Sequence, residues 1–239
     1  MTIYPSWTDQ AIGVTGQPDG RRVLSRRSFE KQEFKTLVLG PASPPGTYTV
    51  EDCTFRNCKV TGGRFVVRDG VILKNVAFEN VTSSDPFTIY TSALCNGVTV
   101  SNTSTRSYLW IKPPESVDDQ EYRDSLIAWI DEVRDSVEVM VDISAFHGEV
   151  SIYGLPARKV VVDPENHVVF RRNWEGMLNW RSLGLRRTSP WVTSLSRLDD
   201  CDFCGTPEGI FDIQSRQKRD TESELMKELD MLRDLGIAE

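Results

Sequence analysis

The sequence predicts a mainly β fold, a short parallel β-solenoid with an inserted amphipathic helix and a C-terminal helix. Two observations support this prediction: an alternation of apolar and polar residues recurs at a nearly constant interval, and glycines separate the copies. Because such a strand has only one apolar face, it has to stack on its neighbours to bury that face. The recurrence therefore predicts strands stacked in successive coils.

The repeat is clearest in its aromatic and amide positions. Phe55 and Phe78 occupy equivalent places in two successive copies, and the same interval separates Asn57 from Asn80. A third and weaker copy places Asn102 almost one further interval along the chain. We expect the equivalent asparagines to form a ladder of side-chain amides along the stack, as polar side chains do in other stacked strands.

The units at residues 53–57 and 76–80 resemble the five-residue unit of pentapeptide-repeat proteins and of related right-handed parallel β-helix proteins. The resemblance covers about residues 48–107 and implies a right-handed parallel β-helix. It also implies that the first residue of each unit and the Phe two positions later point inward. The coils here are longer than those of pentapeptide repeats and contain glycines, so the broader β-helix class fits better.

The succession of patterns predicts four parts. Residues 1–47 are expected to form an N-terminal cap and residues 48–172 the solenoid, which an amphipathic helix at 116–135 interrupts. Residues 173–214 are expected to form a second cap rich in Trp and Arg, and 215–239 a final helix.

Capping and apolar patterns predict how the two helices begin and which face they bury. Ser116 and Asp119 have the spacing of a capping box, and so do Thr221 and Glu224 at the start of the final helix. The apolar stripe of the final helix consists of Leu225, Leu229 and Leu232. This stripe either docks on the rest of the chain or joins a second copy or another partner.

The bulk composition is that of an ordinary globular protein. Of the 239 residues, 39% are hydrophobic and 26% charged, and no stretch approaches the roughly 18 apolar residues that a membrane helix needs. Five scattered cysteines and the lack of a secretory pattern predict reduced thiols and a cytoplasmic location without membrane association. A net charge of −7 makes nucleic acid an improbable general ligand and favours solubility.

Two short clusters suggest chemistry, but each has a simpler explanation. Cys201 and Cys204 could form one edge of a tetrahedral zinc site, yet no second pair of ligands follows in the sequence. Residues 163–167 bring together carboxylates, an amide and an imidazole, which also suit a tight turn. His147 is expected at a strand end. We therefore predict no metal and no cofactor.

The segment from Arg171 to Arg197 is unusual in charge and aromatic content. It holds six arginines against a single acid, Glu175, which is a local charge of +5, and three of the six tryptophans. Arg and Trp are enriched in interface hot spots, so we predict a partner-binding surface here. Alternatively, the tryptophans cap the core and the arginines pair with acids elsewhere, or the segment binds an anion. The candidate partner-binding residues are Arg171, Arg172, Trp174, Trp180, Arg181, Arg186, Arg187 and Trp191.

No segment carries a specific catalytic signature. The sequence therefore favours a non-catalytic, inhibitory protein-binding function, of the kind seen in bacterial immunity proteins that neutralise toxins. One alternative is a carbohydrate-active lyase or hydrolase that uses groove residues. The candidate groove residues are Asp52, Arg56, Arg68, Asp69 and Lys74. Another alternative is a structural subunit of a larger assembly, which oligomerises or docks through its final helix.

Overall fold

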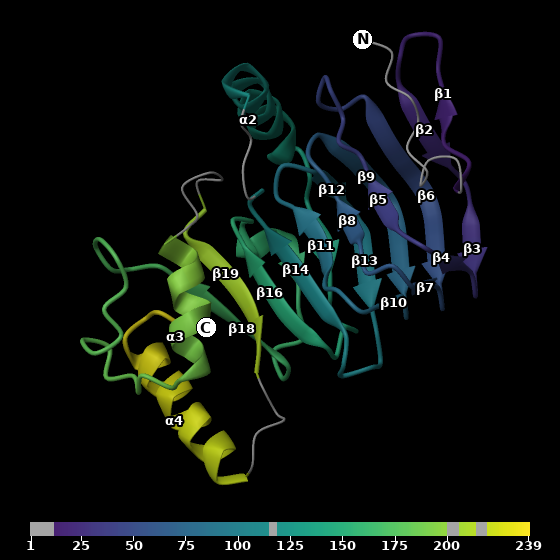
Figure 1. Cartoon of the computed structure of the whole chain (residues 1–239). Helices are drawn as coiled ribbons and strands as arrows, with labels where there is room; N and C mark the ends of the chain where they lie inside the picture. Colours follow the sequence, from purple (N-terminus) through teal and green to yellow (C-terminus); the bar gives the residue numbers. More distant parts are fainter. Residues whose placement is uncertain (1–11, 115–118, 200–205, 214–218) are drawn as a thin grey trace.

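The computed structural model describes residues 12–114, 119–199, 206–213 and 219–239 (Figure 1). In these residues the strands form three sheets of nine, three and seven strands. About 37% of the residues are in strands and 20% in helices, a mixed α/β arrangement. We refer to the sheets as A, B and C.

Sheet A contains β1 (Thr15–Gly16), β2 (Arg22–Ser25), β3 (Ser28–Glu30), β6 (Tyr48–Arg56), β9 (Val71–Glu79), β12 (Leu94–Asn96), β13 (Val98–Ser101), β15 (Val141–Asp142) and β17 (Val160–Val161). Sheet B contains β4 (Glu33–Phe34), β7 (Lys59–Val60) and β10 (Thr82–Ser83). Sheet C contains β5 (Leu37–Leu39), β8 (Phe65–Val67), β11 (Phe87–Tyr90), β14 (Tyr108–Lys112), β16 (Glu149–Tyr153), β18 (His167–Arg171) and β19 (Glu208–Asp212). The helices are α2 (Gln120–Arg134), α3 (Pro190–Ser196) and α4 (Arg219–Asp234), with a 3₁₀ turn, η1 (Ala157–Lys159).

The predictions of a mainly β right-handed parallel β-helix, and of membership in that class, are wrong. The sheets are mixed, because β1 pairs antiparallel with β2, and β19 pairs antiparallel with both β16 and β18. Beyond residue 171 the repeat ends, and helices pack on the last strands to form a second apolar core. The repeat therefore described only part of the chain.

The sequence repeat nevertheless matches the strand register within sheet A. In the parallel pair β6–β9, Phe55 lies opposite Phe78 and Cys53 opposite Val76, which is the interval of the repeat. In the pair β9–β13, Phe78 lies opposite Val100. The rings of Phe29, Phe55 and Phe78 stack with centroid separations of 4.7 and 5.2 Å. Each such pair adds about 1 kcal/mol beyond its buried area.

The repeated asparagines serve the backbone. Asn57 and Asn80 adopt left-handed conformations, with φ of 53° and 50°, which Asn tolerates better than most residues. Among the described residues no amide ladder links them, so that expectation is wrong. The Asn80 side chain instead accepts a hydrogen bond from the Thr103 backbone N–H at 3.2 Å.

Helix α2 lies across the loops that follow the strands of sheet C (Figure 1). Asp119 caps it and accepts a hydrogen bond from the Tyr122 backbone N–H at 3.0 Å, so the helix begins after Asp119 and not at the predicted residue 116. Ser116 lies outside the described residues. The Tyr122 hydroxyl donates to the Ala42 carbonyl at 2.7 Å, which fixes the helix on the loop after β5.

The second core lies between α3, α4 and the strands β18 and β19. The stripe of Leu225, Leu229 and Leu232 is fully buried there, so these leucines dock on their own chain. Residues 237–239 run along β18: the Arg171 N–H donates to the Ile237 carbonyl, and the Glu239 N–H donates to the Val169 carbonyl. None of the described helices has both the length and the apolar character that a membrane crossing requires.

Candidate interaction site around Met177

Three of the predicted partner-binding residues make contacts within their own chain. Trp191 is 1% exposed, and its indole N–H donates to a backbone carbonyl of α4 at 3.2 Å. Arg186 pairs with Glu228 at 2.8 Å, and Arg171 pairs with Glu239 at 3.0 Å. Burial alone would raise the pKa of the Glu228 carboxyl, but the hydrogen bonds it receives, chiefly from Arg186, outweigh burial and lower that pKa. These contacts are of the kind that the alternative of capping and internal pairing describes.

A single carboxylate organises the next part of the predicted surface. Asp199, whose side chain is 8% exposed, accepts hydrogen bonds from Arg172 Nε at 3.2 Å, Trp174 Nε1 at 2.9 Å and the Leu178 backbone N–H at 2.8 Å. Arg172 also donates to the Gly176 carbonyl at 2.6 Å, across the same loop. Asp199 therefore binds the chain both before Gly176, at Arg172 and Trp174, and after it, at Leu178.

The tied loop presents Met177 to solvent. Met177 is 82% exposed, whereas the other exposed large hydrophobic residues in the described part of the chain are 37–47% exposed. Gly176, with φ of +67°, makes the turn that precedes it. We call residues 172–181 the Met177 loop; in Figure 1 it lies in the green irregular segment beside α3, at the end of the molecule away from β1.

Three further predicted residues extend this surface. Trp180 is half-buried, and the Arg181 guanidinium lies 5.0 Å from the centroid of its ring, within the range of a cation–π contact. Arg187 is exposed a few residues further along. The segment thus carries an exposed thioether followed along the chain by aromatic and cationic side chains, residue types that suit contact with a protein surface.

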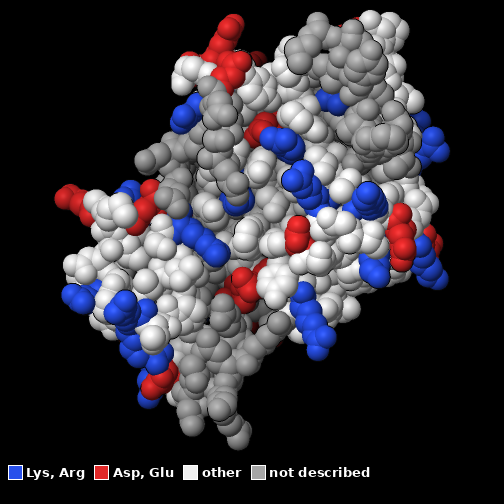
Figure 2. All heavy atoms as spheres, viewed as in Figure 1, with Lys and Arg blue, Asp and Glu red and all other residues white. Residues whose placement is uncertain are grey.

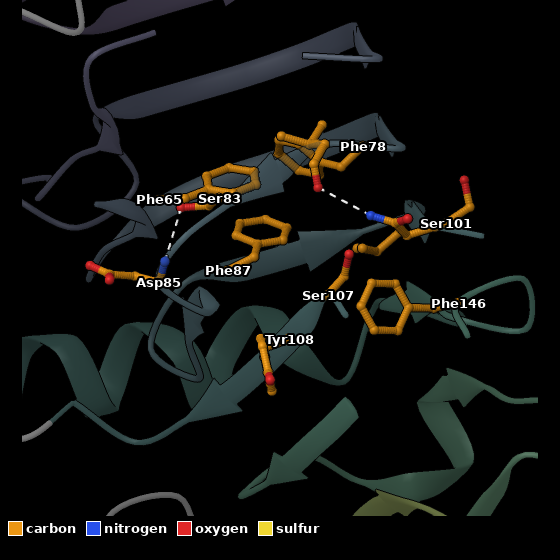
Figure 3. Close-up of a pocket in the computed structure, with 12 residues that line it drawn as sticks. Phe65, Phe78, Ser83, Asp85, Phe87, Ser101, Ser107, Tyr108 and Phe146 are labelled. Atoms are coloured by element: carbon orange, nitrogen blue, oxygen red, sulfur yellow. Dashed lines mark hydrogen bonds between the residues drawn. The ribbon is translucent and has the colours of Figure 1, made fainter. Parts of the chain in front are cut away.

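The small pocket drawn in Figure 3 does not offer an alternative site for an organic ligand. Its volume is about 20 Å³, enough for about one water molecule. The rings of Phe65, Phe78, Phe87 and Phe146 line it, together with Ser83 and Ser107.

Three of the five groove residues considered for a carbohydrate enzyme are engaged with their neighbours. Asp69 is buried and accepts a hydrogen bond from Ser92 Oγ at 2.7 Å. Arg56 forms an ion pair with Glu79 at 2.5 Å, and Asp52 accepts a hydrogen bond from a side-chain amide on β9 at 3.1 Å. These contacts give the charges a role between adjacent strands.

The cluster at residues 163–167 is a turn. Asp163 accepts hydrogen bonds from the backbone and side-chain amides of the turn itself, and these lower its pKa. His167 is buried, and burial lowers the pKa of its imidazole. The described residues contain no group of three or more His, Cys, Asp or Glu side chains placed to hold a metal ion. Cys201 and Cys204 lie outside the described residues.

Sequence reasoning missed Met177 and Asp199. Neither residue belongs to a periodic pattern, and Asp199 lies 21 or more residues from the groups it binds. A Gly-Met pair between two tryptophans was the available signal, because Gly in such a stretch favours an exposed turn.

Comparisons with protein-family models, with curated proteins and with solved structures found no match to this chain. The site is therefore interpreted from its own geometry.

Proposed function

We propose that this protein is a non-catalytic, inhibitory binding protein that recognises another protein through the Met177 loop. The observation that supports the proposal is the 82% exposure of Met177 on a loop held by Asp199. Burying a methionine side chain in a partner contributes about 1.5–3 kcal/mol. Because the loop is already ordered, little of that free energy is lost in fixing its conformation.

The partner surface has to complement this loop. An apolar pocket would receive Met177, and a nearby carboxylate would pair with Arg181 or Arg187, which are both exposed. Arg186 and Arg171 are less suitable contacts, since their guanidinium groups already pair with acids of this chain.

The cytoplasm is the compartment that we propose for this interaction. Cys53, Cys58 and Cys95 are free and buried thiols, as expected in a reducing environment. A bacterial toxin remains the specific partner that the sequence analysis predicts, and a toxin assay would follow once a partner is isolated.

The experiment is photocrosslinking from the loop, followed by measurement of affinity. A benzophenone amino acid at position 177 should capture one protein from the cells in which the chain is made. With that protein purified, calorimetry should show that Met177→Asp weakens binding at least about tenfold, which is about 1.4 kcal/mol. Met177→Leu should change affinity little, because it keeps the apolar volume.

The matched control is Val161→Asp, the same kind of change at another exposed apolar residue, 40% exposed on sheet A. If Val161→Asp weakens binding as much as Met177→Asp does, or if Met177→Asp has no effect, the loop is not the interface.

A further inference from the structure

The outer face of sheet C carries aromatic and cationic side chains that the Met177 loop does not use. On β14, Leu109 and Ile111 point into the core, so Tyr108, Trp110 and Lys112 point outward. Tyr108 is 37% exposed. The face lies between α2 and α3 in Figure 1.

Trp110 lies near two cations on this face. Lys112 Nζ is 5.4 Å from the centroid of the Trp110 ring, and the Arg197 guanidinium is 5.9 Å away. Arg197 is held from below by a hydrogen bond to Ser151 Oγ at 2.5 Å. The indole N–H of Trp110 has no hydrogen-bond partner among the described residues. That nitrogen is buried, so this donor is not open to an incoming segment.

Two arginines extend the positive charge across the sheet. Arg64 and Arg68 flank β8, and both are exposed because Phe65 and Val67 take the inward positions. No ion pair joins either arginine to an acid in the described part of the chain. They differ in this from Arg171 and Arg186, and their charges are available to a partner.

The acids on this face are fewer than the bases. Glu149 lies opposite Tyr108 in the strand register, and Asp85 precedes β11. Figure 2 shows this face, with a band of Lys and Arg side chains across it and Asp or Glu side chains between them near its centre. The chain as a whole carries a charge of −7, so a positively charged surface is a local feature of this face.

We propose that this face is a second interaction surface, and that its occupant is an acidic segment of a polypeptide. Charge complementarity favours this occupant, because carboxylates on the segment would pair with Arg64 and Arg68. A segment that crosses the strands meets a new row of side chains about every 4.8 Å, so acidic and apolar residues in alternation would reach both bases and rings.

The test is fluorescence anisotropy of a labelled oligoglutamate peptide with the full chain, at low and at physiological ionic strength. We expect saturable binding that weakens as salt is added. The Arg64→Ala/Arg68→Ala double variant should weaken binding about fivefold or more, since it removes two charge pairs. Both substitutions are at exposed positions, and circular dichroism would establish that the variant is folded.

The matched control is the Lys59→Ala/Lys74→Ala double variant, which changes the net charge equally at exposed positions on sheets B and A, away from sheet C. Equal loss of binding in both double variants would overturn the proposal, and so would a lack of binding by the wild-type chain. Tighter binding of oligodeoxythymidylate or heparin than of oligoglutamate would overturn it in favour of another polyanion. Met177→Asp should leave oligoglutamate binding unchanged, which separates this proposal from the proposed function.

Discussion

Replacing Asp199 by alanine should both destabilise the protein and loosen the Met177 loop. The Asp199 carboxylate accepts three hydrogen bonds, from Arg172, Trp174 and the Leu178 N–H. At about 1 kcal/mol for each bond, the loss of free energy of unfolding is about 3 kcal/mol. The estimate needs little correction for solvent screening, because the Asp199 side chain is only 8% exposed.

Asp199→Asn is the matched variant for this prediction. It keeps the size of the side chain and one acceptor oxygen, but it offers an NH₂ group to donors that need an acceptor. The loss should therefore be smaller, about 2 kcal/mol. Urea unfolding measures the loss of stability, and hydrogen exchange of residues 173–178 measures the order of the loop.

This role of Asp199 also requires that partner affinity fall in both variants, in the same order as the protection of the loop amides from hydrogen exchange. It is refuted if Asp199→Ala changes stability by less than about 1 kcal/mol and leaves the exchange of the loop amides as in the wild type.

Three other predictions concern buried groups. Lys159 Nζ donates to the Arg134 carbonyl, at the end of α2, at 2.6 Å. Lys159→Met should therefore lower the free energy of unfolding, measured with urea, by about 1–2 kcal/mol, and an unchanged free energy would contradict this. Burial lowers the pKa of His167 from 6.5, so the folded state favours the neutral ring. The free energy of unfolding should be constant above the unfolded pKa and fall as the pH drops from about 6.5 through the folded pKa. His167→Gln should make that fall smaller in urea unfolding measured across pH, and an unchanged dependence on pH would count against this role of His167. Burial raises the pKa of Cys95 to about 12, so its alkylation, followed by site-resolved mass spectrometry, should occur only on unfolding, and rapid labelling of the native protein would disprove this.

Strand register could be predicted from the sequence, but the complete fold could not. The alternation around Phe55 and Phe78 is local, and equal spacing places equivalent residues side by side. The direction of the last strands depends on contacts outside the repeat: β19 enters sheet C antiparallel between β16 and β18, and no periodicity marks it. The fold class was therefore wrong although the pairing of repeats was correct.

The candidate site shows a similar limit. The composition of residues 171–197 located an unusual segment, but it did not show which arginines are available. Arg186 is engaged by Glu228, 42 residues further on, whereas Arg187 beside it is exposed. Pairing of this kind depends on three-dimensional proximity, so charge counts along the sequence could not separate the two. The surface on sheet C was missed because its residues come from separate strands.

The short segment at residues 237–239 has a consequence for solubility. It runs antiparallel beside β18 and occupies backbone groups of Val169 and Arg171, while Ala238 bridges to Phe170. Without it, the outer edge of sheet C would present unpaired donors and acceptors, which other chains can pair with. These three residues therefore cover the edge of sheet C. If they were displaced, β18 would become an exposed edge strand with which another chain could pair.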